Sequence, residues 1–373
     1  MGQLVGKIVL TGGPCAGKTT ALSRIETELS ERGFRVFVVG ESATELIKGG
    51  IKPFGNHAFN LLNFQRLILQ YQMDKESIYE KAIAMLPEEE KAIIVYDRGL
   101  MDNKAYIPLE FRDIIAEKEL NELEMLDNYD MVLHLVTAAD GCPEFYTLEN
   151  NQARSESIEE AIALDKKTQQ AWVGHNRLVI IDNSTTFEEK LGKVLENIYH
   201  LVNSPYGIQF QRKYLVDLKN SNLDFINEDG VTTTYIEQCY LEDETENYER
   251  RLRKRIHSGG EGHYLTVQKK AADGLTKIVT DKKITEKEYL RLLEMSKVIG
   301  TVKKTRYTFV YKKQYLRLDV FEDGLGILEC NPMSASTKIN LPESLRIEKE
   351  VTDDHDFDNL TFAKRKGKKK VKK

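Results

Sequence analysis

The sequence predicts an α/β domain with a parallel sheet covered by helices on both faces, followed by an α+β domain built on an antiparallel barrel or tunnel. Three observations predict this order. A glycine-rich loop near the N-terminus stands between an apolar strand and a helix. Strand-sized apolar runs then alternate with helical patterns, which is typical of parallel sheets. After residue 203 the strands alternate apolar and polar residues, which is typical of antiparallel sheets.

The glycine-rich loop is the strongest signal in the chain. Residues 12–19 fit the pattern G-x-x-x-x-G-K-[ST] at every fixed position, between an expected strand, 7–11, and an expected helix, 19–32. Such a loop turns backbone N–H groups toward a β-phosphate, and the helix N-terminus adds its positive dipole end. The predicted nucleotide-binding residues are Gly12, Gly13, Pro14, Cys15, Ala16, Gly17, Lys18, Thr19 and Thr20.

Two residues of this loop have distinct predicted roles. Lys18 would reach the β- and γ-phosphates, and the hydroxyl of Thr19 would hold Mg²⁺. We therefore expect a nucleoside triphosphate and Mg²⁺ as cofactors. The sequence lacks the guanine-reading motif N-K-x-D, so GTP and ATP both remain open at this point.

Asp97 and Arg98 follow the apolar strand 91–96. An acid at the tip of a strand beside the phosphate loop is the usual second holder of Mg²⁺, so we expect Asp97 to be a metal ligand. Asp-Arg at this place resembles the small-molecule kinases of the P-loop class. That resemblance implies catalytic roles, in which the acid handles the metal or the acceptor hydroxyl and the arginine holds an anion. A surface turn after the strand is the alternative.

Two further polar residues could belong to the same site. Glu41, at the end of the expected strand 35–39, would contact an acceptor in the kinases of this class, or it would cap a helix near Ala43. Arg154 precedes an expected helix and could be a catalytic lid arginine that closes on the γ-phosphate. A solvated charge at the helix start is the alternative for Arg154.

The chain is expected to divide into three parts. Residues 1–202 form the nucleotide-binding domain, and the run from Asn203 to Gly207 marks the boundary. Residues 207–351 form the antiparallel domain, which includes a helix from Thr285 to Val298 with Thr285 as its N-cap. Residues 352–373 are polar and charged and are expected to form a disordered polybasic tail.

The second domain resembles the CYTH-like family, the triphosphate tunnel enzymes and their relatives, over about 140 residues. The resemblance rests on 209–216, 236–241, the alternating arginines 251–255, and the strands around residues 304, 319 and 329. Period-two alternation places basic side chains where they can line one tunnel and collect a phosphate-rich anion. The predicted tunnel residues are Lys213, Arg251, Arg253, Lys304, Arg306, Asp319 and Glu329.

The sequence departs from that family where the family binds its catalytic metals. Gln209 and Gln211 stand in place of two first-strand glutamates, and Asn331 stands in place of one of the last pair. Neutral amide oxygens are weaker ligands for a hard divalent cation than carboxylates. We therefore expect a domain that binds anions without hydrolysing tripolyphosphate, and at most slow nucleotide hydrolysis in the first domain.

Both domains together resemble the family of TRP-like-channel translocation defect proteins, a P-loop domain fused to a CYTH-like domain. The resemblance implies GTP binding, binding of anionic lipid headgroups such as phosphatidic acid or phosphoinositides, and a role in membrane protein trafficking. The alternative is a P-loop kinase that phosphorylates a nucleoside-like or vitamin-like acceptor.

Composition limits the partners and the compartment. The net charge is −5, and the last ten residues hold eight Lys or Arg, so subtracting +8 leaves −13 for the rest. Such a basic tail can touch anionic membrane surfaces, and we do not expect a nucleic-acid partner, although a basic run alone does not separate RNA, nucleus and membrane. Four cysteines without metal-ligand spacing predict reduced thiols in a cytoplasmic protein. The basic tail predicts that this protein is partly peripheral to a membrane.

Overall fold

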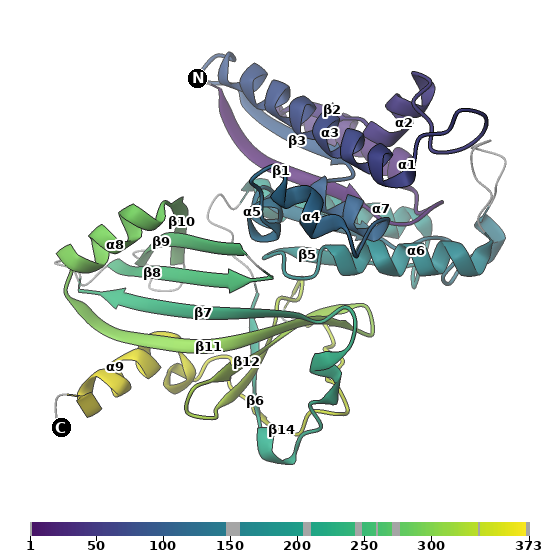
Figure 1. The fold of residues 1–373 in the computed structure, drawn as a ribbon. Helices are drawn as coiled ribbons and strands as arrows, with labels where there is room; N and C mark the ends of the chain where they lie inside the picture. The colour runs from purple at the N-terminus through teal and green to yellow at the C-terminus, as the bar shows by residue number, and fades with distance from the viewer. Residues whose placement is uncertain are drawn as a thin grey trace. The chain divides into compact units, whose positions relative to one another are not determined.

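The computed structural model describes residues 2–146, 157–203, 210–242, 248–258, 260–270, 277–334 and 336–370 (Figure 1). The chain divides into two compact units, Met1–Asn203 and Ser204–Lys373. Each unit contains its own sheet, of parallel strands in the first and antiparallel strands in the second. None of the described helices is both long and apolar enough to cross a bilayer.

The first unit contains a five-stranded parallel sheet in the order β2-β3-β1-β4-β5. Its strands are β1 (Gln3–Thr11), β2 (Arg35–Val39), β3 (Lys91–Asp97), β4 (Met131–Leu135) and β5 (Leu178–Ile181). Its α-helices are α1 (Lys18–Glu31), α2 (Ser42–Lys48), α3 (Leu61–Ala84), α4 (Phe111–Ala116), α5 (Glu122–Asp127), α6 (Ile158–Ala171) and α7 (Phe187–Asn203). Short 3₁₀ helices are η1 (Leu100–Ala105) and η2 (Pro143–Phe145). The parallel α/β fold predicted from the alternating pattern is therefore confirmed.

The central strands of the first unit are continuous apolar runs because they lie in its core. Strand β1 is paired on both sides, with β3 and with β4. Ile8 and Leu10 are fully buried and pack with residues of α1 and α7, such as Ile25 and Val194. Because β1 is central, its carboxyl end places the phosphate loop in the middle of the sheet edge, where ligands bind in such folds.

The second unit is a nine-stranded antiparallel sheet in the order β10-β9-β8-β7-β11-β12-β13-β6-β14. Its strands are β6 (Arg212–Val216), β7 (Thr232–Leu241), β8 (Tyr248–His257), β9 (Gly260–Lys270), β10 (Lys277–Ile284), β11 (Val298–Tyr311), β12 (Gln314–Phe321), β13 (Gly326–Cys330) and β14 (Ile347–Glu350). Its helices are α8 (Glu286–Met295), α9 (Asn359–Lys370) and the 3₁₀ turns η3 (Leu218–Asn220), η4 (Asp224–Asn227) and η5 (His355–Phe357). The antiparallel prediction is confirmed, and the described strand pairs form an open order rather than a closed ring.

Helix α8 begins where its cap was predicted. The Oγ1 atom of Thr285 accepts a hydrogen bond from the backbone N–H of Glu288 at 3.1 Å. This bond satisfies one of the first N–H groups of the helix, which have no intrahelical partner. The helix ends at Met295, three residues before the predicted end.

The prediction of a disordered tail from residue 352 is wrong for the part that the structure describes. That part contains η5 and α9, and Phe362 and Ala363 are buried with Tyr240 and Val302 in one apolar cluster. The phenyl ring of Phe362 lies 5.1 Å from that of Phe321, edge to face. Phe357 and Leu360 pack against the same cluster, so four apolar residues of the segment help to order it.

Candidate functional site

The phosphate loop joins β1 to α1 through backbone angles that favour glycine. Gly12 and Gly17 have φ values of 140° and 88°. A Cβ atom at Gly12 would lie 2.0 Å from the carbonyl oxygen of Leu135, so no side chain fits there. Cys15 also has a positive φ, 53°. The loop is therefore held in a tight, strained shape, as a backbone cradle for phosphate requires.

The side chain of Lys18 lies over this loop. Its Nζ atom donates to the carbonyl oxygens of Gly12 and Gly13, both at 3.2 Å. Burial and the nearby charge of Arg98 lower the pKa of Lys18 to about 8. The ammonium group thus lies over the phosphate loop. An added anion would offset the cost of burying its charge.

Asp97 lies at the end of β3 and fits a Mg²⁺ site. Its Oδ1 atom is buried and has no hydrogen-bond partner among the described residues. Burial raises the pKa of Asp97, although the charge of Lys18 counteracts it. A buried carboxylate oxygen without a partner is costly unless a cation binds it.

The residues present suit a metal shared with a nucleotide rather than an all-protein site. No group of three or more His, Cys, Asp or Glu in the described part of the chain could hold a metal ion. Mg²⁺ is usually bound by one or two protein ligands together with phosphates and water. Asp97 and the exposed Thr19 are the residues that would hold it, and the ion would then neutralise phosphate charge.

Arg98 is engaged with two acids beside the loop. Its Nε donates to Glu41 Oε1 at 2.6 Å, and its Nη1 lies 3.5 Å from Asp102 Oδ1. The other Glu41 oxygen accepts from Thr44 at 2.5 Å. Burial alone would raise the pKa of Glu41, but Arg98 and Lys18 outweigh it and lower that pKa to about 2. Glu41 therefore orients Arg98, and each of its oxygens accepts one hydrogen bond from this chain.

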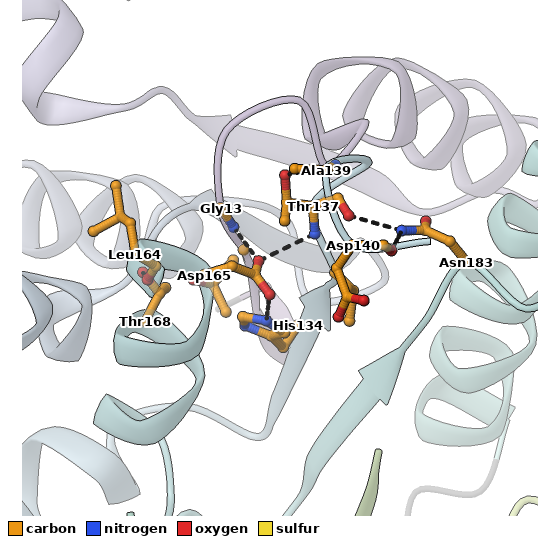
Figure 2. Close-up of polar contacts among 12 residues, drawn as sticks. Gly13, His134, Thr137, Ala139, Asp140, Leu164, Asp165, Thr168 and Asn183 are labelled. Carbon is orange, nitrogen blue, oxygen red and sulfur yellow. Dashed lines mark hydrogen bonds and ion pairs between the residues drawn. The ribbon is translucent and has the colours of Figure 1, made fainter. Parts of the chain in front are cut away.

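Asp165 of α6 was not predicted from sequence, and it fixes the phosphate loop through hydrogen bonds. Figure 2 shows its carboxylate between the loop, β4 and the residues that follow β4. Its Oδ1 accepts the backbone N–H of Gly13 at 2.6 Å and that of Thr137 at 3.2 Å. Its Oδ2 lies 3.3 Å from His134 Nε2. Asp165 is 152 residues from Gly13 in sequence, and no local motif marks it.

A second contact missed by the sequence analysis fixes the start of α7. Lys190 is buried, and its Nζ donates to the carbonyl oxygen of Val136 at 2.8 Å and to Asn183 Oδ1 at 2.7 Å. The amide of Asn183 in turn donates to the carbonyl oxygens of Thr137 and Asp140, as Figure 2 shows. The segments that follow β4 and β5 are thereby tied together beside the phosphate loop.

In the second unit, strand register places the predicted basic residues on one face of the sheet. Residues directly opposite each other in neighbouring strands point to the same side. Arg306 is opposite Asp319, and Glu329 is opposite Lys213. The pairs that connect β8, β7, β11, β12, β13 and β6 extend this face from Arg251 and Arg253 to Lys213. We call this side of the sheet the basic face.

Each of the five predicted cations on the basic face has an acidic partner. Arg253 pairs with Asp281, and Nη1 of Arg251 lies 3.7 Å from Glu249 Oε1. Lys304 donates to Asp319 at 2.5 Å, and Arg306 donates to both Asp319 oxygens and to Glu329 at 2.6 to 2.8 Å. Lys213 pairs with Asp358, just before α9, at 2.8 Å. Asp319 and Glu329 are thus partners of basic groups here, and the C-terminal segment lies on the same face.

Three arginines of β8 and β12 differ in one donor atom from Lys304 and Arg306, which we call the compensated centre. The Nε atoms of Arg251, Arg253 and Arg317 are buried and lack hydrogen-bond partners within the described ranges. Burial lowers the pKa of Arg253 and of Arg317. Arg253 also lies 4.9 Å from the ring centroid of Tyr264. Arg317 was not predicted, although its strand was. Buried donors without acceptors suit an added anion.

Two residues named from sequence lie outside the described residues. They are Arg154, the predicted lid arginine, and Gln209, the first of the replaced metal ligands. Gln211 is described and exposed. Asn331 follows directly after β13.

Comparisons with known proteins agree with a nucleotide-binding first unit. Residues 7–190 match the family model of an AAA domain. No curated protein matches the chain. Among solved structures, the inorganic triphosphatase NE1496 is 23% identical, with a TM-score of 0.32, over 42% of this chain and 94% of that one. The PH1819 protein from Pyrococcus horikoshii OT3 is 18% identical, with a TM-score of 0.26, over 34% and 80%. TM-scores this low establish no function.

Proposed function

We propose that this protein binds a Mg²⁺–nucleoside triphosphate in its first unit and a phosphate-rich anion on the basic face of its second unit. GTP is the proposed nucleotide and an anionic phospholipid headgroup is the proposed anion, as the resemblance to the TRP-like-channel translocation defect family implies. The role in membrane protein trafficking that the same resemblance implies remains a prediction.

One observation carries the nucleotide proposal. The strained loop, the Nζ atom of Lys18 above it and the unpartnered oxygen of Asp97 meet at the carboxyl edge of one parallel sheet. These are a phosphate cradle, a cation for the β- and γ-phosphates and a ligand for Mg²⁺. We do not propose the kinase alternative, because the Glu41 carboxylate serves Arg98 and Thr44 and nothing among the described residues marks a place for an acceptor.

The nucleotide proposal is tested by Lys18→Ala in the full chain. We expect the affinity for Mg²⁺–GTP and Mg²⁺–ATP to fall about 100-fold, because a charge-assisted bond to phosphate is lost without replacement. Calorimetric titration measures the affinity and also shows which base binds more tightly. Lys166→Ala, an exposed lysine of α6, is the control. Equal affinities in wild type and Lys18→Ala would overturn the proposal.

The anion proposal rests on the buried donors of β8. Arg251 and Arg253 face the same side as the compensated centre, and their Nε atoms have no partner among the described residues. Asp319 is held by Lys304 and Arg306, so it is not arranged as a metal ligand. This is the arrangement of an anion binder rather than of a metal-dependent phosphatase.

The test of the anion proposal uses the Lys18→Ala chain, so that the phosphate loop does not contribute. We expect Arg251→Ala with Arg253→Ala to weaken binding of tripolyphosphate and of vesicles with phosphatidic acid at least about 10-fold. Arg250→Ala, on the opposite face of the same strand, should leave binding unchanged. We also expect no phosphate release from tripolyphosphate with Mg²⁺ or Mn²⁺. Robust release would contradict the argument from the missing metal ligands.

A further inference from the structure

An exposed aromatic ring lies directly against the phosphate loop. Phe187 is the first residue of α7 and is 46% exposed. Its Cε2 atom lies 2.6 Å from the position that a Cβ of Gly17 would take. Gly17 is therefore required both by its positive φ and by this ring. The ring lies beside the junction between the loop and α1.

Phe187 continues the apolar stripe of α7 past the edge of the core. Leu191, Val194 and Ile198 follow it at helical spacing and are all buried. Phe187 occupies the same side of the helix, yet nearly half of its side chain is open to solvent. Single exposed apolar residues are common on protein surfaces. What distinguishes Phe187 is that its ring lies against Gly17 of the phosphate loop.

The local structure holds this ring in place. The residue before it, Thr186, accepts the N–H of Glu189 at 3.3 Å, and its own N–H and hydroxyl both donate to Glu189 Oε2 at 2.9 Å. One turn further, Lys190 anchors the helix to Val136 and Asn183. A capped and anchored first turn fixes the position of Phe187, as a preorganised binding surface requires.

The direction of the bound triphosphate follows from the residues around the loop. Lys18 reaches the β- and γ-phosphates, and Asp97 with Arg98 marks the γ-phosphate end. In that orientation the α-phosphate and the nucleoside would leave the loop toward the start of α1, where Gly17 and the exposed Thr20 lie. Phe187 lies against Gly17 at that end.

We propose that Phe187 is the platform on which the nucleobase stacks, and that the site prefers purine nucleoside triphosphates. The proposal rests on the proposed nucleotide binding in the first unit. A phenyl ring can stack on any base, and the larger face of a purine covers more of it. The platform therefore discriminates by ring size, while the choice between guanine and adenine depends on other groups.

The test is calorimetric titration with Mg²⁺–GTP, Mg²⁺–ATP, Mg²⁺–UTP and tripolyphosphate. Every variant is made in the full chain carrying Arg251→Ala and Arg253→Ala, so that the basic face does not contribute to tripolyphosphate binding. Phe187→Leu keeps apolar packing on Gly17 but removes the aromatic face. We expect this variant to weaken the binding of the purine nucleotides about 5- to 30-fold and that of UTP less. The binding of tripolyphosphate should not change. Phe187→Trp should stay within about 3-fold of the parent chain. Phe54→Leu is the control, because Phe54 is equally exposed at 46% in the segment between α2 and α3.

The outcomes separate this inference from the function on which it rests. If Lys18→Ala leaves nucleotide affinity unchanged, nucleotide binding by the loop is itself wrong. If binding depends on Lys18 but Phe187→Leu matches the Phe54→Leu control, only the platform is wrong. An equal loss for tripolyphosphate and GTP also overturns the platform, because Phe187 would then act through the shape of the loop.

A fluorescence measurement gives a second readout that does not depend on Phe187→Leu folding normally. The tryptophan in Phe187→Trp should be quenched by Mg²⁺–GTP and not by tripolyphosphate, and Lys18→Ala should abolish the quenching. The native Trp172 is fully buried, and the wild-type chain measures its contribution. Absence of nucleotide-dependent quenching, with affinity retained, would place the base elsewhere.

Discussion

The pKa values of three carboxylates in the first unit shift by different amounts and in different directions, because their neighbours differ. Burial raises the pKa of Asp97, which lacks a partner at Oδ1, while Arg98 and Lys18 overcome burial and lower that of Glu41 to about 2. Glu76 is buried on α3, and burial raises its pKa to about 7. Glu41 therefore stays ionised beside Arg98, whereas a cation would stabilise the charged form of Asp97.

Glu76 makes the stability of the first unit depend on pH. Its oxygens accept from Tyr129 Oη at 2.8 Å, Asn128 Nδ2 at 2.9 Å and Gln72 Nε2 at 3.3 Å, and Lys7 is the nearby cation. An acid whose folded pKa lies above its ordinary value of 4.5 stabilises the fold below pH 4.5. That contribution is lost as the pH rises through 7, because the ionised form is disfavoured in the folded state.

We therefore predict that Glu76→Gln flattens this dependence. Between pH 4.5 and pH 8 the free energy of unfolding should shift in favour of the variant, relative to wild type, by at most about 3 kcal/mol. Urea unfolding at several pH values measures the difference. Asp74→Asn, which removes an exposed acid of the same helix, is the control. Parallel pH profiles for wild type and Glu76→Gln would show that Glu76 does not titrate in this range.

At the scale of residues, the sequence predicts what a local motif specifies. The loop places Lys18 and Thr19, and the end of a strand places Asp97, since each role depends on neighbours in sequence. Asp165 and Arg317 were missed, because their roles come from backbone and strands that only the tertiary fold brings close. The phosphate loop can be recognised as a sequence motif, whereas the hydrogen bond from Gly13 N–H to Asp165 Oδ1 cannot.

Among the elements, α9 shows how few apolar residues order a basic segment. Its Ala363 lies so close to β11 that a Cβ at Gly300 would meet the carbonyl oxygen of Ala363 at 2.4 Å. Phe362 packs with the ring of Phe321 and, at 6.3 Å between centroids, with that of Phe357. The prediction of disorder rested on the charge of this segment and did not consider the spacing of its apolar residues.

We predict that Phe362→Ala loosens α9. The lost burial and the cavity should lower the free energy of unfolding of the second unit by about 3 kcal/mol, while the first unit is unaffected. Scanning calorimetry of the full chain measures both, provided that the two units unfold separately. Phe210→Ala removes a 45% exposed ring of the same unit and should cost little. Equal losses for the two variants would mean that α9 contributes nothing to the core.

For the whole molecule, the sequence predicts two sheets of different type. It does not predict which acidic side chains pair with the cations of the basic face. Alternation along β11 correctly places Lys304 and Arg306 on one face, because the period of a strand is a local property. Their pairing with Asp319 depends on the register between β11 and β12. Five converging cations were expected, and the structure instead places an acid beside each of them, while the Nε atoms of Arg251 and Arg253 lack a partner among the described residues.

The order of α9 also changes how the basic tail must be tested. A chain cut after Thr361 would lose Phe362 and Ala363, so weak membrane binding could reflect damage to the core. A chain ending at Arg365 keeps both residues and the 2.6 Å pair between Arg365 and Asp356. It still removes six lysines of the C-terminus, which makes it the sharper variant.

We predict that this shortened chain binds anionic vesicles more weakly at low salt. Each lysine gains up to about 1 kcal/mol near an anionic leaflet, and the gain fades as the Debye length falls from about 10 Å at 0.1 M salt toward about 3 Å at 1 M. Co-sedimentation with phosphatidic acid vesicles at low and high salt measures it, with neutral vesicles and a full-length chain carrying glutamine for the six lysines as controls. If truncation changes nothing, the tail is not the membrane contact. Any lipid binding must then come from the basic face, where the Arg251→Ala and Arg253→Ala chain should lose it, and that binding should be less sensitive to salt because its donors are buried.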